Sequence, residues 1–190
     1  WYEESSPKSI EVFQDSFLEE GQYFSLDNQI ESEVFNGQGI RIQRNTLGLL
    51  IAQDLIEEGH LSQKTTFYSN GDPQSIIAYH KGLIHGKKQN FLIGGIPSSV
   101  EEWSMGKLDG LVIVFHNGEK FKEIPYQKGN KEGVSRRFKE GNIVIEESSW
   151  KGDLRHGPTH TYIGDNIKTE WFFRGEQVSK QYFDEISIPR

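Results

Sequence analysis

The chain has 190 residues, a net charge of −7 and no cysteine. The missing cysteine excludes disulfide scaffolds, thiolate metal sites and thiol catalysis for this span. The negative charge weighs against a general nucleic-acid-binding protein, because phosphate contacts need an excess of lysine and arginine. Aromatic residues make up 12% of the sequence, which argues against disorder, yet hydrophobic residues reach only 34%, which is sparse for a thick globular core.

The negative charge is concentrated in the N-terminal third. Residues 1–58 hold 12 acidic and 3 basic side chains, a net of −9, whereas residues 59–190 hold 16 acidic and 18 basic side chains, a net of +2. A solvated entry segment is the simpler interpretation. The alternative is an acidic docking surface for a basic partner, because a local field of one sign steers molecules of opposite charge.

The chain begins at Trp1, and its only methionine is Met105. We therefore expect a processed or trimmed chain, and an exported or envelope-attached location is favoured over a cytoplasmic one. The longest charge-free stretches, Asn45–Gln53 and Gln89–Val100, are far shorter than the roughly 20 apolar residues of a membrane helix.

Two stretches near the N-terminus are predicted as strands. Ile10–Asp15 has the composition of a degenerate strand. Leu47–Leu61 shows weak helical periodicity, but Ile56 and Gly59 match a repeat that continues along the chain. Leu49–Ile56 is therefore predicted as a strand.

Glycines recur with a period of about 23 residues in three columns that are in phase. The first column runs from Gly37 to Gly175, the second lies four residues further on, and the third runs from Gly71 to Gly164. Around Gly157 the pattern requires one extra residue, which we assign to His156. The glycines predicted to have a structural role at turns are Gly82, Gly86, Gly106, Gly110, Gly129, Gly133, Gly152, Gly157 and Gly175.

Each repeat is predicted to form a β-hairpin. Asn70-Gly71 and Asn117-Gly118 indicate two-residue type I′ turns, which need positive φ at both central positions. The runs between turns are rich in aromatic and β-branched residues, which is typical of strands. The Gly–three residues–Gly segments are predicted to be return loops between hairpins. We expect Gly82→Val to destabilise the fold by about 1–3 kcal/mol, and the same change at Gly21, outside the columns, to cost less.

These hairpin segments resemble the MORN repeat, and more closely its bacterial variant. The residues that carry the resemblance are FYSNGDPQSIIAYHKGLIHG (67–86), EEWSMGKLDGLVIVFHNGEKF (101–121), IPYQKGNKEGVSRRFKEG (124–141) and SSWKGDLRHGPTHTYIG (149–164). The resemblance implies an all-β, elongated array of antiparallel hairpins in a single twisted sheet. It also divides the chain into a divergent N-terminal cap segment (1–22), degenerate repeats (23–58), and regular repeats with a C-terminal cap (59–190), in which the charged end Gln181–Arg190 serves as the cap.

The residues that could carry catalysis or bind a metal do not form a recognisable site. His156 and His160 have the i, i+4 spacing of a helical metal site, but Gly157-Pro158 between them excludes an ordinary helix interior. Adjacent carboxylates such as Glu146-Glu147 point to opposite faces of a strand, so they do not converge on one bond. We therefore predict no catalytic activity, no metal site and no cofactor.

A row of aromatic residues is the remaining candidate site. Tyr79, Trp103, Tyr126 and Phe172 each stand three residues before a first-column glycine, so they are predicted to line one face. Cross-repeat stacking that holds the sheet together is one interpretation, and a partner-binding groove is the other. Lysines and arginines near the linkers are either solvated turn residues or a basic strip that faces acidic lipid or protein.

The predicted function is a non-catalytic protein-binding or scaffolding module. The partner is expected to be a protein and not a nucleic acid, and contact with a membrane surface is a weaker alternative. The resemblance to the bacterial variant implies a second role, as the antitoxin of a toxin–antitoxin pair. A third alternative is an envelope-anchored structural or interaction protein, either a lipoprotein or an exported one.

Overall fold

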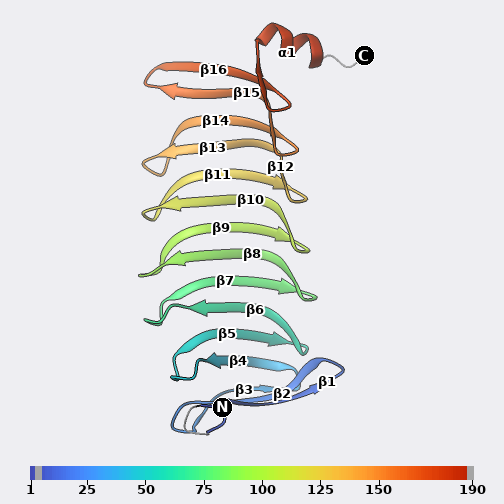
Figure 1. Cartoon of the computed structure of the whole chain (residues 1–190), viewed down its shortest axis with the longest axis vertical. Helices are drawn as coiled ribbons and strands as arrows, with labels where there is room; N and C mark the ends of the chain where they lie inside the picture. The colour runs from blue at the N-terminus through green and yellow to red at the C-terminus, as the bar shows by residue number, and fades with distance from the viewer. Residues whose placement is uncertain (3–5, 188–190) are drawn as a thin grey trace. The chain divides into compact units, whose positions relative to one another are not determined.

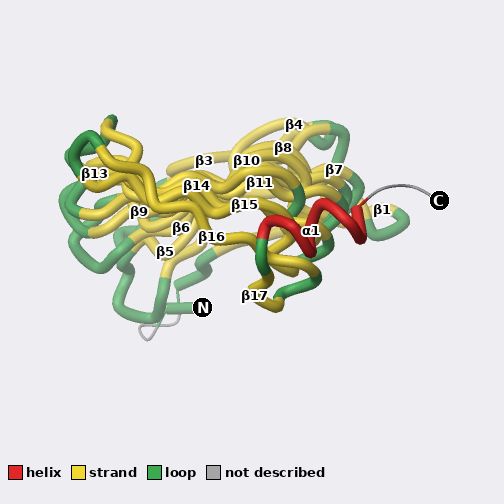
Figure 2. The backbone as a smooth tube through the Cα atoms, turned by 90° about the horizontal axis from the view of Figure 1, so that it is seen from above, coloured by secondary structure: helices red, strands yellow, loops and turns green. Residues whose placement is uncertain are grey.

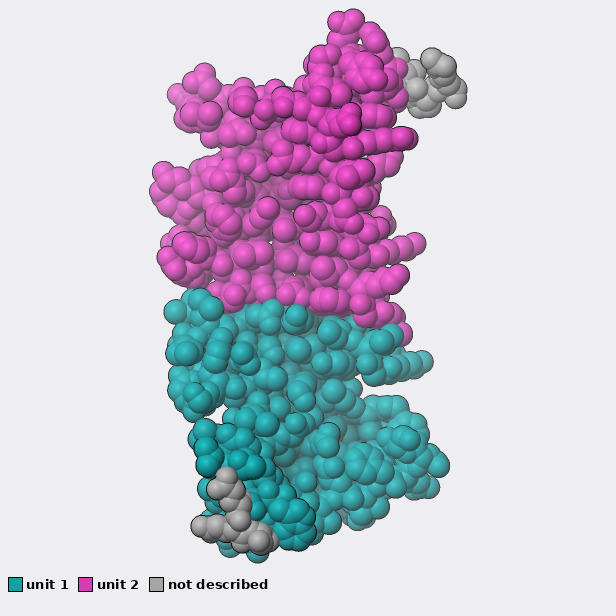
Figure 3. All heavy atoms as spheres, viewed as in Figure 1, with its two compact units in different colours: residues 1–96 teal, residues 97–190 magenta. Residues whose placement is uncertain are grey.

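The structure is a computed structural model that describes residues 1–2 and 6–187. Residues 3–5 of the predicted N-terminal segment and 188–190 of the predicted C-terminal cap lie outside the described residues. The strands form one antiparallel sheet of 17 strands in hairpin order (Figure 1). The all-β hairpin array predicted from the sequence is therefore confirmed. The chain divides into two compact units, Trp1–Ile96 and Pro97–Arg190, coloured separately in Figure 3.

Eight strands lie within unit 1, and successive strands pair as antiparallel neighbours. The strands are β1 (Ser9–Gln14), β2 (Phe17–Phe24), β3 (Ile30–Phe35), β4 (Gln38–Arg44), β5 (Leu50–Glu57), β6 (His60–Phe67), β7 (Pro73–His80) and β8 (Leu83–Leu92). The predicted strands at Ile10–Asp15 and Leu49–Ile56 correspond to β1 and β5, so both predictions are confirmed.

Unit 2 continues with hairpins and ends in a helix, and its first strand begins at Ile96, the last residue of unit 1. The elements are β9 (Ile96–Ser104), β10 (Lys107–His116), β11 (Glu119–Gln127), β12 (Asn130–Lys131), β13 (Gly133–Lys139), β14 (Ile143–Lys151), β15 (Leu154–Ile163), β16 (Asn166–Phe173), β17 (Glu176–Val178) and α1 (Lys180–Ser187).

The first-column glycines lie in tight turns, and the predicted return loops are wrong. Lys81 and Gly82 have φ of 50° and 75°, the left-handed pair of a two-residue turn, and β8 begins at the next residue. Gly86, predicted to end the loop, lies inside β8 with φ of 91°, next to an irregularity in the pairing register. A glycine with positive φ bends a strand without ending it, so the second column marks bulges.

The two strongest turn predictions have different outcomes. Asn117 and Gly118 have φ of 52° and 80°, so the predicted two-residue type I′ turn is confirmed there. At Asn70-Gly71 the loop is longer, because Tyr68 donates its N–H to the Asp72 carbonyl (2.9 Å) and Gly71 donates to the Tyr68 carbonyl (3.0 Å). Only Gly71 of this loop has positive φ. The Asn70 side chain accepts the Asp72 N–H at 3.1 Å, which stabilises the wider loop.

The extra residue does not lie at His156; the register places it in the loop between β13 and β14, where three residues separate Lys139 from Ile143. In the turn before β15 the order is reversed: Gly152 comes first and Asp153 takes the place that glycine holds in other turns, with φ of 59° and 68°. Counted from Asp153, Gly157 lies four residues on, as the second column requires. Aspartate can occupy this left-handed position because its short polar side chain tolerates it, so the spacing from turn to second-column glycine is unchanged at His156.

The N-terminal strands fold back against the strands that follow them. Strands β3 and β4 pair at only two positions, and Gly39 (φ 146°) approaches the backbone of Glu33 so closely that a Cβ there would collide with it. The side chains of β1–β3 consequently contact those of β4–β6. Leu18, Tyr23, Val34 and Ile56 form the buried cluster, with Ile42 and Leu61 packed against it.

A short C-terminal helix covers the last hairpin of unit 2; it is red in Figure 2. Ser179 begins it by accepting the Tyr182 N–H on its hydroxyl (3.2 Å), as a helix N-cap does. The Phe183 ring lies 5.1 Å from Trp171 and 5.5 Å from His156. The sequence predicted a cap at Gln181–Arg190, and in its described part the helix contacts the last hairpin through the Phe183 ring.

The structure reverses the expected ranking of two glycine substitutions. A Cβ on Gly21 would lie 2.9 Å from Cζ of Tyr23, which is fully buried, whereas a Cβ on Gly82 would meet nothing within 4 Å. We therefore expect Gly21→Ala to lower the free energy of unfolding by about 2–3 kcal/mol. Gly82→Ala should cost about 1 kcal/mol, because only its positive φ opposes the change. Urea denaturation measures both, and equal values would show that the Tyr23 ring moves aside.

Candidate partner-binding face

The four predicted rings occupy equivalent places in their hairpins. Tyr79 lies on β7 in unit 1, while Trp103, Tyr126 and Phe172 lie on β9, β11 and β16 in unit 2. Each ring is the second-last residue of its strand and pairs with a residue five positions later in the chain, as Tyr126 does with Lys131. The three rings of unit 2 are thus placed by the hairpin register, as the glycine spacing predicted.

A fifth aromatic residue belongs to the same row and was missed by the sequence reasoning. Trp150 pairs with Gly133 on one side and with Arg155 on the other, which is the place that Tyr126 and Phe172 hold in their hairpins. Counting from Gly152 placed Ser149 in this position. The reversed turn Gly152-Asp153 shifts the count by one residue, and counting from Asp153 would have identified Trp150.

Cations alternate with the rings along this row in unit 2. The Lys131 Nζ lies 4.6 Å from the Trp150 ring centroid. The Arg155 guanidinium lies 4.9 Å from the Phe172 ring and 5.9 Å from the Trp150 ring. A cation over the face of an aromatic ring is attracted by the ring quadrupole. We call this alternating series the ring–cation ladder; its members are Tyr126, Lys131, Trp150, Arg155 and Phe172.

Small polar side chains lie beneath the rings. Ser135 and Ser148 are paired in the register of β13 and β14, and both are buried. The Trp150 indole N–H donates to the Ser135 hydroxyl at 2.8 Å, which fixes the ring over the strand. Small side chains such as serine and threonine leave room for an aromatic ring to lie over the sheet. The rings therefore shield this face of the single-layer sheet from solvent.

The ladder is half-buried and keeps an accessible surface. Phe172 is buried, whereas Tyr126, Lys131, Trp150 and Arg155 are partly exposed. Burial, followed by the charges of Asp153 and Glu101, raises the pKa of Tyr126, so its hydroxyl stays protonated at neutral pH. The rings therefore both hold the sheet and present flat apolar area beside two cations, and the two interpretations of the row are compatible.

An ion pair lies on the opposite face of unit 2. Arg136 Nε lies 2.8 Å from Glu147 Oε1, and the Tyr162 hydroxyl donates to Glu147 Oε2 at 2.8 Å. These hydrogen bonds, with that of Tyr162 the largest cause, lower the pKa of the Glu147 carboxyl.

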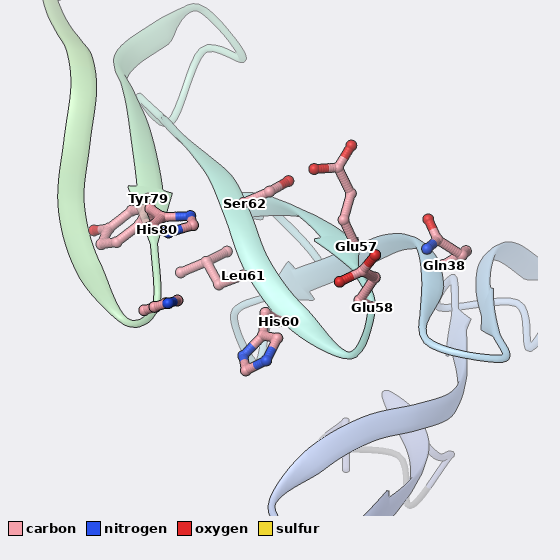
Figure 4. A pocket seen from close by; sticks show the side chains of 9 residues that line it. Gln38, Glu57, Glu58, His60, Leu61, Ser62, Tyr79 and His80 are labelled. Carbon is pink, nitrogen blue, oxygen red and sulfur yellow. The ribbon is translucent and has the colours of Figure 1, made fainter.

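Tyr79 belongs to unit 1 and lies beside an open hollow of about 490 Å³ there. In Figure 4 the side chains of three successive hairpins line it: Gln38, Glu57, Glu58, His60, Leu61, Ser62, Tyr79 and His80. His60 and His80 come from different hairpins. Within residues 1–2 and 6–187, no group of three or more histidine, cysteine or acidic side chains is arranged to hold a metal ion.

His156, which the sequence analysis assigned as an extra residue of the repeat, packs against the C-terminal helix. Its ring lies 5.0 Å from the Phe173 ring and 5.5 Å from the Phe183 ring. Burial, followed by the positive charges of Lys151 and Arg174, lowers the pKa of His156, so the ring is neutral at neutral pH.

The sequence matches none of the protein-family models and none of the curated proteins with which it was compared. The resemblance to MORN repeats therefore stays a prediction. No helix in the described part of the chain is long and apolar enough to cross a membrane.

Proposed function

We propose that the chain is a non-catalytic repeat protein that binds a protein partner along the ring–cation ladder and acts as a binding module or scaffold. The observation that carries this proposal is the ladder itself. Lys131 and Arg155 lie over the rings of Trp150 and Phe172 on a partly exposed face. Aromatic residues and arginine are the side chains that contribute most to protein interfaces.

The shape of the ladder favours an extended protein segment as the ligand. Its members recur once per hairpin along the sheet, so a partner that runs along the face can make the same type of contact repeatedly. A guanidinium stacked on a ring keeps N–H groups for carboxylates of a partner. The arrangement of Glu146 and Glu147 also supports a non-catalytic role, because each is held by a different arginine, Arg137 or Arg136.

Charge reversal on the ladder tests this function. We expect Lys131→Glu with Arg155→Glu to abolish capture of the partner by the immobilised chain, while the thermal melt changes little because partly exposed cation–π contacts contribute only about 0.5–1 kcal/mol each. Capture is quantified by mass spectrometry of proteins retained from a lysate of the source cells.

The matched control is Lys139→Glu with Lys168→Glu, because both lysine side chains are more than half exposed and lie outside the ladder. A partner that is retained by the wild type and the control but lost by the ladder variant supports the proposal. Equal retention by all three chains would exclude the ladder as the site, and the absence of any specifically retained protein would count against a protein-binding function.

A further inference from the structure

Three exposed apolar side chains and two carboxylates share the outer face of β1–β3 in unit 1. Ile10, Val12 and Phe35 are 54%, 51% and 65% exposed. In the strand register Val12 lies opposite Glu20, and Ile10 lies in one row with Gln22 and Glu33. These side chains line one hollow of about 340 Å³. We call the set Ile10, Val12, Glu20, Glu33 and Phe35 the β1–β3 patch.

The patch is acidic because every cation of the N-terminal third is engaged elsewhere. Residues 1–58 contain only three basic side chains. Arg41 and Arg44 form ion pairs with Glu11 (2.8 Å) and Glu31 (2.7 Å). The third, Lys8, donates its ammonium to the Arg44 carbonyl at 3.4 Å.

The carboxylates of the patch keep their charge available. Among the described residues, neither Glu20 nor Glu33 has an ion-pair partner, and Glu33 only accepts a hydrogen bond from the Gln22 amide at 2.9 Å. Apolar side chains that are half exposed, next to uncompensated charges of one sign, are typical of an interaction surface.

We propose that the β1–β3 patch is a docking site for a basic, apolar segment of a partner protein. The apolar side chains of that segment cover Ile10, Val12 and Phe35, and its lysines or arginines pair with Glu20 and Glu33. Charge complementarity selects this occupant, because the surface presents carboxylates without cations and the net charge of −9 in residues 1–58 repels acidic partners. This site lies in unit 1 and does not depend on the ring–cation ladder.

The spacing between the side chains of the patch favours an extended segment in which apolar and basic side chains alternate on the side that faces the patch. Ile10 and Val12 are two residues apart on one strand, which places them about 6.6 Å apart along it. Residues two apart in an extended segment point to the same side, so apolar and basic residues at every second position present both kinds of side chain to the patch at this interval. A synthetic peptide of repeated Leu-Ser-Lys-Ser, the leucine–lysine peptide, is therefore the probe. A peptide of repeated Leu-Ser-Glu-Ser of equal length, the leucine–glutamate peptide, is the control probe.

Binding of the two peptides to the full chain is measured by fluorescence anisotropy. We expect the leucine–lysine peptide to bind, and its affinity to fall as the salt concentration rises from about 50 mM to about 300 mM. The leucine–glutamate peptide should not bind. Val12→Ser with Phe35→Ser should weaken binding about tenfold by removing apolar contact area. Glu20→Gln with Glu33→Gln should weaken it to a similar degree, about tenfold, and remove most of the salt dependence.

Matched controls distinguish binding at the β1–β3 patch from non-specific binding to the rest of the chain. Ile163→Ser with Ile167→Ser removes two apolar side chains that are each 61% exposed in unit 2, and it should leave binding unchanged. Glu140→Gln with Glu176→Gln removes two exposed carboxylates outside the patch and should also have no effect. On the wild-type chain, the leucine–lysine peptide should protect the amides of β1–β3 from hydrogen exchange, which tests the site without any variant.

Several results would overturn the proposal. Equal binding by the wild type and both patch variants would show that the peptide binds elsewhere, as would protection confined to other strands. Binding of the leucine–glutamate peptide would contradict the charge argument. A wild-type chain that sediments as a dimer, and patch variants that sediment as monomers, would assign the patch to a second copy of the chain.

Discussion

Tyr23→Ala is expected to lower the free energy of unfolding of unit 1 by about 3–5 kcal/mol, the cost of removing a large aromatic side chain from a packed core. Tyr23 is fully buried in the cluster with Leu18, Val34 and Ile56. Its hydroxyl also donates to Glu11 Oε1 at 3.0 Å. Hydrogen exchange of the amides in β2, β3 and β5, followed in urea, measures the local loss.

Two further variants show which part of Tyr23 matters. Tyr23→Phe keeps the ring and loses only the hydrogen bond, so we expect a cost of about 1–2 kcal/mol. Phe13→Ala removes a ring that is 54% exposed in the same unit and should cost well under 1 kcal/mol. If Tyr23→Ala were as mild as Phe13→Ala, the N-terminal fold-back would not contribute to stability.

The ionisation of Tyr23 adds a pH dependence to the same prediction. Burial, followed by the negative charge of Glu11, raises the pKa of the Tyr23 hydroxyl above its ordinary value of 10.0. The unfolded state then releases this proton first as the pH rises. The stabilisation is therefore complete below about pH 10 and is lost progressively above it. The Tyr23→Phe variant should lack this part of the alkaline unfolding.

Asp54→Ala is the second substitution with a large expected effect, about 3 kcal/mol, because it leaves the partly buried Lys64 ammonium without its counter-charge. Asp54 is 2% exposed. Its carboxylate lies 3.2 Å from Lys64 Nζ and 3.8 Å from Arg41 Nη1, and it accepts the Gln43 amide at 2.6 Å. Urea denaturation followed by circular dichroism measures the change.

A double variant identifies the cause of that loss. Lys64→Met in the Asp54→Ala background removes the unpaired charge, so it should recover part of the stability. Glu140→Ala, which breaks a surface contact with Lys139 at 3.4 Å, is the control and should change stability by no more than about 1 kcal/mol. A double variant that is less stable than Asp54→Ala would show that lost packing, and not the unpaired charge, explains the effect.

The hairpins were predictable because their signals are local. Turn residues such as Asn117-Gly118 specify positive φ within two positions, and the strands between turns contain the residue types that favour extended backbone. The same local reasoning failed at Asn70-Gly71, where hydrogen bonds between Tyr68 and Asp72 form a wider loop. It also failed at Gly152-Asp153, because aspartate occupies the second turn position that glycine holds elsewhere. Counting from Gly152 therefore placed the aromatic position one residue too early.

The candidate site was predictable only in part. The spacing of the glycines placed Tyr126 and Phe172 in one row, and the register of the strands confirms their equivalent positions. Trp150 was missed because of the reversed turn. The cations of the ladder were attributed to turns, since no sequence pattern states that Lys131 and Arg155 lie over the neighbouring rings.

The sequence by itself determined the all-β class, the period of the repeat and the order of the hairpins, because backbone dihedral preferences and strand propensity act between residues that are close in the chain. Only the tertiary structure decided the fold-back of β1–β3 and the docking of α1. Glu11 meets Arg41 and His156 meets Phe183 across wide sequence separations. Such contacts depend on how the strands bend and on which faces they bury. A periodic sequence pattern contains no information about strands that do not follow the repeat.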